Sequence, residues 1–140
     1  MKTTAIFMPT FALMLWTALV LVQVPIRRFT AYCRRRASFE DFRYGDSPHV
    51  PPDVALPNRV FMNLLEVPVL FYVLTLIAFV TGNVNPVVVG LCWGYVFLRV
   101  VHSLVYFTYN HPVHRFAVFV ASNLVVLTLI FYLGQAFLWA

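Results

Sequence analysis

The chain alternates between four long apolar stretches and three more polar segments. The apolar stretches cover residues 5–24, 59–81, 87–109 and 114–138. Each is about 20 residues long or longer, which is the length that an α-helix needs to cross the hydrocarbon core of a bilayer. Because lipid cannot bond backbone N–H and C=O groups, such segments satisfy them internally as helices. The pattern therefore predicts an all-α integral membrane protein, an antiparallel bundle of four helices forming one domain over residues 1–140.

The segments between these stretches differ in character. Residues 25–58 hold most of the charged residues, a glycine and five of the prolines, which predicts the one substantial loop. Pro25 is expected to end the first helix. The uncharged G-N-V-N-P sequence at 82–86 predicts a tight turn. Pro112 is placed as the first residue of the fourth helix.

Composition supports lipid as the solvent for much of the surface. Hydrophobic residues make up 61% of the 140 residues, and charged residues only 11%. Soluble domains carry about 25% charged residues, so this chain has too little polar surface to be one. The expected surroundings are membrane lipids.

The net charge of +5 is concentrated rather than spread. Six arginines lie between residues 27 and 43, directly after an apolar stretch, and Arg115 lies in the other segment on the same side. Lysine and arginine gather on the cytoplasmic side of membrane proteins. The sequence thus predicts that the loop 25–58 is cytoplasmic and that both termini are outside. Arginines flanking a span favour anionic lipid headgroups and give no reason to expect nucleic acid as a partner.

Polar side chains inside the apolar stretches are costly, so each needs a reason. Arg59, Asn63 and Glu66 are spaced i, i+4 and i+7 and share an arc of about 60° on one helix face. On the third helix four polar residues share an arc of about 80°. They are Arg99, His102, Tyr106 and Asn110. Both sets run toward the cytoplasmic end.

Pro68 is expected to kink the second helix about a turn beyond Glu66 and to widen this end of the bundle. The two polar faces are then expected to converge with Arg27 and Arg115 into a cup rich in guanidinium groups. Arginine binds carboxylates through two parallel hydrogen bonds, so the cup suits a small anion with several carboxylates.

Three other interpretations remain open. Glu66 and Arg99 are candidates for a buried ion pair that joins two helices, with Asn63 and Tyr106 as interhelical hydrogen bonders. The histidines at 49, 102, 111 and 114 are candidates for a metal site, although no carboxylate or cysteine stands beside them at a ligand spacing. Glu66 with His102 is also a candidate proton relay in a small transporter.

Three motifs stand out in order along the chain. They are R-V-F-M-N-L-L-E at 59–66, R-V-V-H-S-L-V-Y at 99–106 and H-P-V-H-R at 111–115. Together they resemble the MAPEG family, the membrane-associated proteins of eicosanoid and glutathione metabolism. The likeness covers about residues 10–138 and looks closest to uncharacterised bacterial members. It implies a homotrimer of four-helix subunits in a bacterial inner membrane, with glutathione as cofactor in the cleft between subunits.

The resemblance also implies roles for individual residues. Arg115 corresponds to the residue beside the glutathione sulfur and is the expected catalytic residue. The expected glutathione-binding residues are Arg27, Arg59, Asn63, Glu66, Arg99, His102 and Tyr106. A guanidinium near a thiol favours the thiolate, which is the nucleophile. The expected function is a glutathione-dependent transferase or peroxidase that attacks a lipophilic small molecule arriving from the bilayer.

The motifs depart from named branches of the family at several positions. Met62 stands where the prostaglandin-forming synthases have a second arginine, and Phe116 where they have a serine. Val67 stands where the leukotriene-forming branch has an aromatic residue. The family also includes a member that presents lipid-like ligands without catalysis. A non-catalytic protein that binds a lipid or lipid-like ligand between subunits is therefore the alternative.

Overall fold

The computed structural model describes residues 3–138 and is entirely helical over that range, without a β-strand. Two short 3₁₀ turns, η1 (Thr3–Ile6) and η2 (Glu40–Phe42), accompany the α-helices. The α-helices are α1 (Phe7–Cys33), α2 (Pro52–Leu65), α3 (Pro68–Val80), α4 (Pro86–Phe107) and α5 (Pro112–Leu138). Within the described range four helical segments are long and apolar enough to cross a membrane, α2 and α3 counting as one. The predicted four-helix membrane bundle is confirmed.

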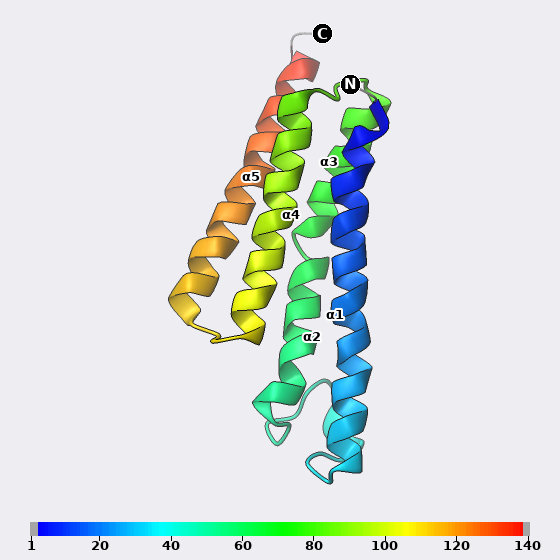
Figure 1. Ribbon diagram of the computed structural model, residues 1–140, viewed down its shortest axis with the longest axis vertical. Coiled ribbons are helices and arrows are strands. Elements are labelled where there is room, and N and C mark those ends of the chain that lie inside the picture. Colours follow the sequence, from blue (N-terminus) through cyan, green and yellow to red (C-terminus); the bar gives the residue numbers. More distant parts are fainter. Residues whose placement is uncertain (1–2, 139–140) are drawn as a thin grey trace.

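The two ends of the bundle are formed by different parts of the chain (Figure 1). The first and last helical turns of the chain lie at one end, and the loop between α1 and α2 lies at the other. The turn between α4 and α5 lies toward the loop as well. We call the end that carries the loop and this turn the basic end, because the arginines of residues 27–43 gather there.

Helix α1 continues beyond its internal proline. Pro25 lies inside the helix, which ends eight residues later at Cys33, so the expectation that Pro25 ends it is wrong. Proline costs one backbone hydrogen bond, but the long apolar helices of membrane proteins tolerate that loss. The helix ends where Arg35 takes a positive φ of 54° and the amide of Arg36 donates to the carbonyl of Ala31.

Pro68 interrupts the second span completely. Helix α2 ends at Leu65, Glu66 has a non-helical ψ of −93°, and α3 begins at Pro68. Proline has no N–H to give to the carbonyl of Leu64, and its ring would collide with that carbonyl in a continuous helix. The expected kink is therefore a break, and it lies at Glu66 and Val67 rather than a turn beyond them.

The turn between α3 and α4 forms as predicted. Gly82 has a φ of +70°, a conformation that costs glycine little, and the next amide returns to the carbonyl of Ala78. Asn85 caps α4, because its side-chain oxygen accepts a hydrogen bond from the amide of Val88 at 3.0 Å. Pro86 occupies the first helical position, where no N–H is needed.

The bundle core is built from one face of each helix. Leu13 and Val20 of α1, Leu64 of α2 and Leu129 of α5 are almost completely buried. Phe71 of α3 packs on Tyr95 of α4, with ring centroids 4.7 Å apart. Large apolar side chains on the opposite faces are exposed, among them Leu15, Leu19, Leu76, Leu127 and Phe131. Patches of this extent do not face water in soluble monomers, so these faces contact lipid or another chain.

The loop is shorter than expected and is held by side-chain contacts. Because α1 ends late and α2 begins at Pro52, the connection is residues 34–51 instead of 25–58. Arg36 binds the Asp53 carboxylate through both Nη atoms, at 2.8 and 3.0 Å. A small cluster of Ala31, Val50, Val54 and Ala55 anchors the loop on α1 and α2.

Candidate functional site

A cavity of about 190 Å³ opens near the basic end between three helices. Helix α2 contributes Asn63, and α4 contributes His102 and Tyr106. Helix α5 contributes the rest of the lining, which is Pro112, Arg115, Phe116 and Phe119. Residues from both polar faces thus meet here. We call this the site cavity.

Tyr106 joins the three helices around the site cavity. Its ring is nearly buried, and its hydroxyl accepts a long hydrogen bond of 3.5 Å from Nδ2 of Asn63. The Arg115 guanidinium lies over the ring, with Cζ 4.0 Å from the centroid. A cation this close to an aromatic face is attracted by the ring quadrupole. Nη1 of Arg115 also donates to Oδ1 of Asn110 at 2.7 Å.

Both of these contacts of Arg115, with the Tyr106 ring and with Asn110, are with neutral groups. Neither a carboxylate nor any other acidic group bonds to it in the part of the chain that the structure describes. Its side chain is partly exposed, so it remains accessible from the cavity. The arrangement leaves a positioned positive charge free to act on an anion.

His102 occupies the wall of the site cavity toward the bundle interior. It is 4% exposed and meets the Tyr106 ring edge-on, with centroids 5.2 Å apart. The Phe119 ring of α5 lies 5.9 Å away on another side. His102 thus packs against aromatic rings of α4 and α5 where it lines the site cavity.

Arg99 lies about one helical turn deeper and is completely buried. Its Nε donates to the Tyr95 hydroxyl at 3.0 Å, and its Nη2 donates to Oδ1 of Asn123 at 3.3 Å. Nη1 is buried without an acceptor among residues 3–135. The suggested ion pair between Arg99 and Glu66 is absent from this part of the chain. Through its hydrogen bond to Arg99, Asn123 links α5 to α4.

The expected convergence of all the polar residues does not occur within one chain. Arg27, Arg59 and Glu66 are exposed, and none of their side chains bonds to another described residue. The cause on α2 is geometric. Val60 and Leu64 face the core, and each helical residue is turned by about 100° from the next, so the polar face points sideways. Only Asn63, at the edge of that face, reaches α4.

Two contributors to this region were not expected from the sequence. Phe119 lines the site cavity and stacks on the Arg99 guanidinium, with Cζ 5.4 Å from its centroid. Tyr95 supplies the phenol that holds Arg99. Tyr95 precedes Arg99 by four residues, a spacing that brings helical side chains together, and was a usable signal. Phe119 lies in an apolar stretch, and no spacing to a polar residue distinguishes it there from the other apolar residues.

The histidines give no support to a metal site over residues 3–135. The rings of His111 and His114 lie 4.7 Å apart, and Nδ1 of His114 is 3.1 Å from the Tyr109 hydroxyl. Within this range no group of three or more histidine, cysteine or acidic side chains lies close enough to hold an ion.

Comparison with known proteins identifies the class. The profile of the MAPEG family matches residues 6–135, nearly the whole chain. No match was found among curated proteins or solved structures. The chain belongs to the MAPEG family and is an integral, multi-pass membrane protein. The resemblance drawn from the three motifs is confirmed.

Proposed function

We propose that this protein is a glutathione-dependent transferase or peroxidase of the membrane, with Arg115 as its catalytic residue. Glutathione binds with its sulfur in the site cavity, and the Arg115 guanidinium favours the thiolate over the thiol. The thiol proton leaves to water, and the thiolate sulfur bonds to an electrophilic carbon of a lipophilic acceptor. The bond from that carbon to its leaving group breaks at the same time, and the leaving group departs with the electron pair and takes a proton from water. In the peroxidase version two thiols become a disulfide as a peroxide O–O bond is reduced.

The observation that carries this proposal is the Arg115 guanidinium, held 4.0 Å from the Tyr106 ring without a carboxylate partner among the described residues. A free thiol has a pKa of about 8.5, and a neighbouring cation lowers it toward neutrality. Neutralisation by a carboxylate would weaken this effect. Membership of the MAPEG family supports glutathione as the thiol.

The size of the site cavity supports a shared site. Its volume of about 190 Å³ is below the range of about 300–1,000 Å³ typical of pockets that bury a whole small molecule. We infer that one chain holds the thiol end of glutathione and that a neighbouring copy supplies groups for its carboxylates. On α2 of that copy, the exposed Arg59 binds a carboxylate of glutathione, and the exposed Glu66 accepts from its ammonium group. The proposed assembly is a homotrimer in a bacterial inner membrane, with the basic end cytoplasmic.

The test is to add glutathione to the purified protein and to follow the ultraviolet absorbance of the thiolate. We expect a saturable rise at neutral pH that Arg115→Ala abolishes. Arg34→Ala, which removes an exposed arginine outside the site cavity, is the matched control and should leave the rise intact. Both variants should keep the helical circular dichroism of the native protein.

The alternative is a non-catalytic protein that binds a lipid-like ligand in the cleft. The apolar part of the site-cavity lining, Pro112, Phe116 and Phe119, favours it. Absence of a thiolate rise in the native protein at saturating glutathione would reject the enzyme proposal. Retention of an extracted lipid that Phe116→Ala releases would then support the alternative.

A further inference from the structure

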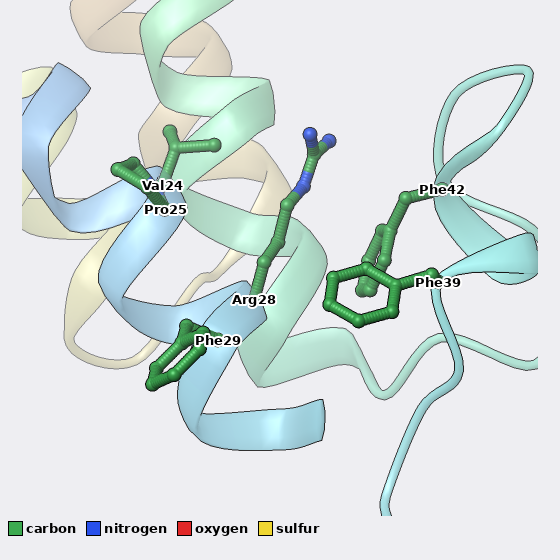
Figure 2. Close-up of a pocket in the computed structure, with 6 residues that line it drawn as sticks. All are labelled: Val24, Pro25, Arg28, Phe29, Phe39 and Phe42. Atoms are coloured by element: carbon green, nitrogen blue, oxygen red, sulfur yellow. The ribbon is translucent and has the colours of Figure 1, made fainter. Parts of the chain in front are cut away.

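A second cavity lies beside the loop and shares no residue with the site cavity. Its volume is about 420 Å³. Helix α1 and the loop contribute its walls, which Figure 2 shows, and these are Val24, Pro25, Arg28, Phe29, Phe39 and Phe42. The lining is apolar apart from Arg28, whose side chain rises between Phe29 and the two loop phenylalanines. We call it the loop cavity.

The loop cavity lies where α1 changes from apolar to basic. Leu21, Val22 and Ile26 are exposed on the preceding turns, and Arg27 begins the arginine-rich part. Exposed apolar side chains followed by arginines mark the boundary between acyl chains and headgroups. A cavity at this level faces the glycerol and phosphate region of the lipid.

Arg28 is fixed in the wall of the loop cavity. Its Nη2 donates to Oδ1 of Asp46 at 2.8 Å, and its Cζ lies 4.9 Å from the centroid of Phe42. The other oxygen of Asp46 accepts from Nδ2 of Asn58 at 3.2 Å, so this carboxylate has partners on both oxygens. Nε of Arg28 is buried without an acceptor in the described part of the chain. The Arg28 side chain as a whole is 29% exposed, so another part of it is open to an incoming ligand.

The surroundings carry a surplus of positive charge. Three of the six arginines in residues 27–43 pair with carboxylates, namely Arg28 with Asp46, Arg36 with Asp53 and Arg43 with Glu40. The remaining carboxylate of the loop, Asp41, is bonded to Ser38 and Ser47 instead. Arg27, Arg34 and Arg35 have no acidic partner among the described residues. A surface of this charge attracts anionic headgroups.

We propose that the loop cavity binds one anionic phospholipid. The phosphate or ester oxygens meet Arg28 in the field of Arg27, and an acyl chain lies along Phe29 and Phe39. These two rings are 64% and 65% exposed, which leaves apolar area for the chain to cover. The site is separate from thiol binding and does not depend on catalysis.

The test is competition between two lipids. Delipidated protein in detergent is mixed with equal amounts of phosphatidylglycerol and phosphatidylcholine, and native mass spectrometry measures the ratio retained. We expect phosphatidylglycerol to be preferred and Arg28→Gln to lower the preference about fivefold, the effect of about one arginine at a membrane surface. Arg34→Gln, with the same change of charge outside the lining, should change it much less.

A second pair of variants covers the case in which Arg28→Gln loosens the loop. Phe29→Ala with Phe39→Ala should lower retention of both lipids, whereas Phe97→Ala with Phe131→Ala, at similarly exposed positions, should not. Equal retention of the two lipids, or an equal effect of Arg28→Gln and Arg34→Gln, would overturn the proposal. Displacement of the lipid by soluble glycerol phosphate would overturn it as well. So would a change of oligomeric state in the Phe29→Ala and Phe39→Ala variant without a change in its lipid retention.

Discussion

At the scale of single residues, the position of Arg115 depends on a short turn. Asn110, which accepts its hydrogen bond, has a φ of +46° in the turn between α4 and α5. Asparagine adopts this conformation more readily than most residues. One residue thus shapes the turn and orients the cation over Tyr106, so Asn110 is a positioning residue for the proposed chemistry.

Asn110→Gly separates these two roles, because glycine keeps the positive φ and removes the side chain. Hydrogen bonds to charged groups are worth about 1.5–3 kcal/mol. We expect glutathione binding to weaken about tenfold and the pH midpoint of the thiolate absorbance to move upward, with the helical content unchanged. Thr108→Ala in the same turn is the control. An unchanged pH midpoint would show that Asn110 does not position Arg115.

Asp41 makes the loop sensitive to acid. Hydrogen bonds from the Ser38 amide and from the Ser38 and Ser47 hydroxyls lower the pKa of its carboxyl from 3.8 to about 2. A carboxyl with a lowered pKa stabilises the folded loop at higher pH, and this contribution is lost as the pH falls toward the folded-state pKa. The loop should therefore lose order between about pH 4 and pH 2.

Hydrogen exchange at residues 38–47, corrected for its intrinsic pH dependence, measures this transition. Asp41→Asn should raise exchange at neutral pH and remove the dependence on acid. Glu40→Gln, a neighbouring exposed carboxylate, is the matched control. A transition that persists in Asp41→Asn would assign it to another group.

At the scale of elements, the start of α4 depends on one cap. Asn85 accepts from the Val88 amide and also donates to the Tyr132 hydroxyl of α5 at 3.0 Å. Loss of an asparagine cap costs about 1 kcal/mol. Asn85→Ala should therefore lower the stability of the bundle by about that amount, measured by thermal or denaturant unfolding in detergent.

Two variants separate the cap from the contact with α5. Asn85→Asp keeps the acceptor for the Val88 amide, and Tyr132→Phe removes only the hydroxyl. We expect both to be less destabilising than Asn85→Ala. If Tyr132→Phe costs as much as Asn85→Ala, the contact between helices, and not the cap, stabilises this end.

At the scale of the whole molecule, the charged groups on the exposed face of α2 are best explained by contact with another chain. Arg59 and Glu66 lie on exposed positions of a segment that is apolar enough to cross a membrane. A charge at the centre of a spanning helix costs about 2.5–3.5 kcal/mol on insertion scales. Cover by another copy of the chain is the arrangement that the proposed homotrimer provides.

Native mass spectrometry should count three chains per particle. Glu66→Arg should increase the fraction of monomer, because it replaces the expected acceptor on this face by a second cation. Glu40→Arg has the same change of charge in the loop, away from α2, and should leave the trimer intact. A monomer as the main species of the native protein would reject the homotrimer and, with it, the shared glutathione site.

Much of the architecture followed from the order of residues. Four apolar stretches, the turn at Gly82 and the cap position before Pro86 depend on local length and backbone preference, and these effects act within a few residues. The interruption at Pro68 was predictable for the same reason. The continuation of α1 past Pro25 was not predictable, because a proline in an apolar stretch breaks the helix at Pro68 but not at Pro25. The outcome depends on whether neighbouring backbone groups find other partners.

The candidate site likewise has features that the local sequence determined and features that only packing determined. Spacing alone determined that Arg59, Asn63 and Glu66 share one face of α2 and that Arg99, His102 and Tyr106 share one face of α4. Which of them meet was decided only by tertiary packing. The core contacts of Val60 and Leu64 set the rotation of α2, so Asn63 reaches Tyr106 while Arg59 and Glu66 point outward. A helical period fixes angles within one helix, whereas the rotation of each helix about its axis depends on side chains that come from the others.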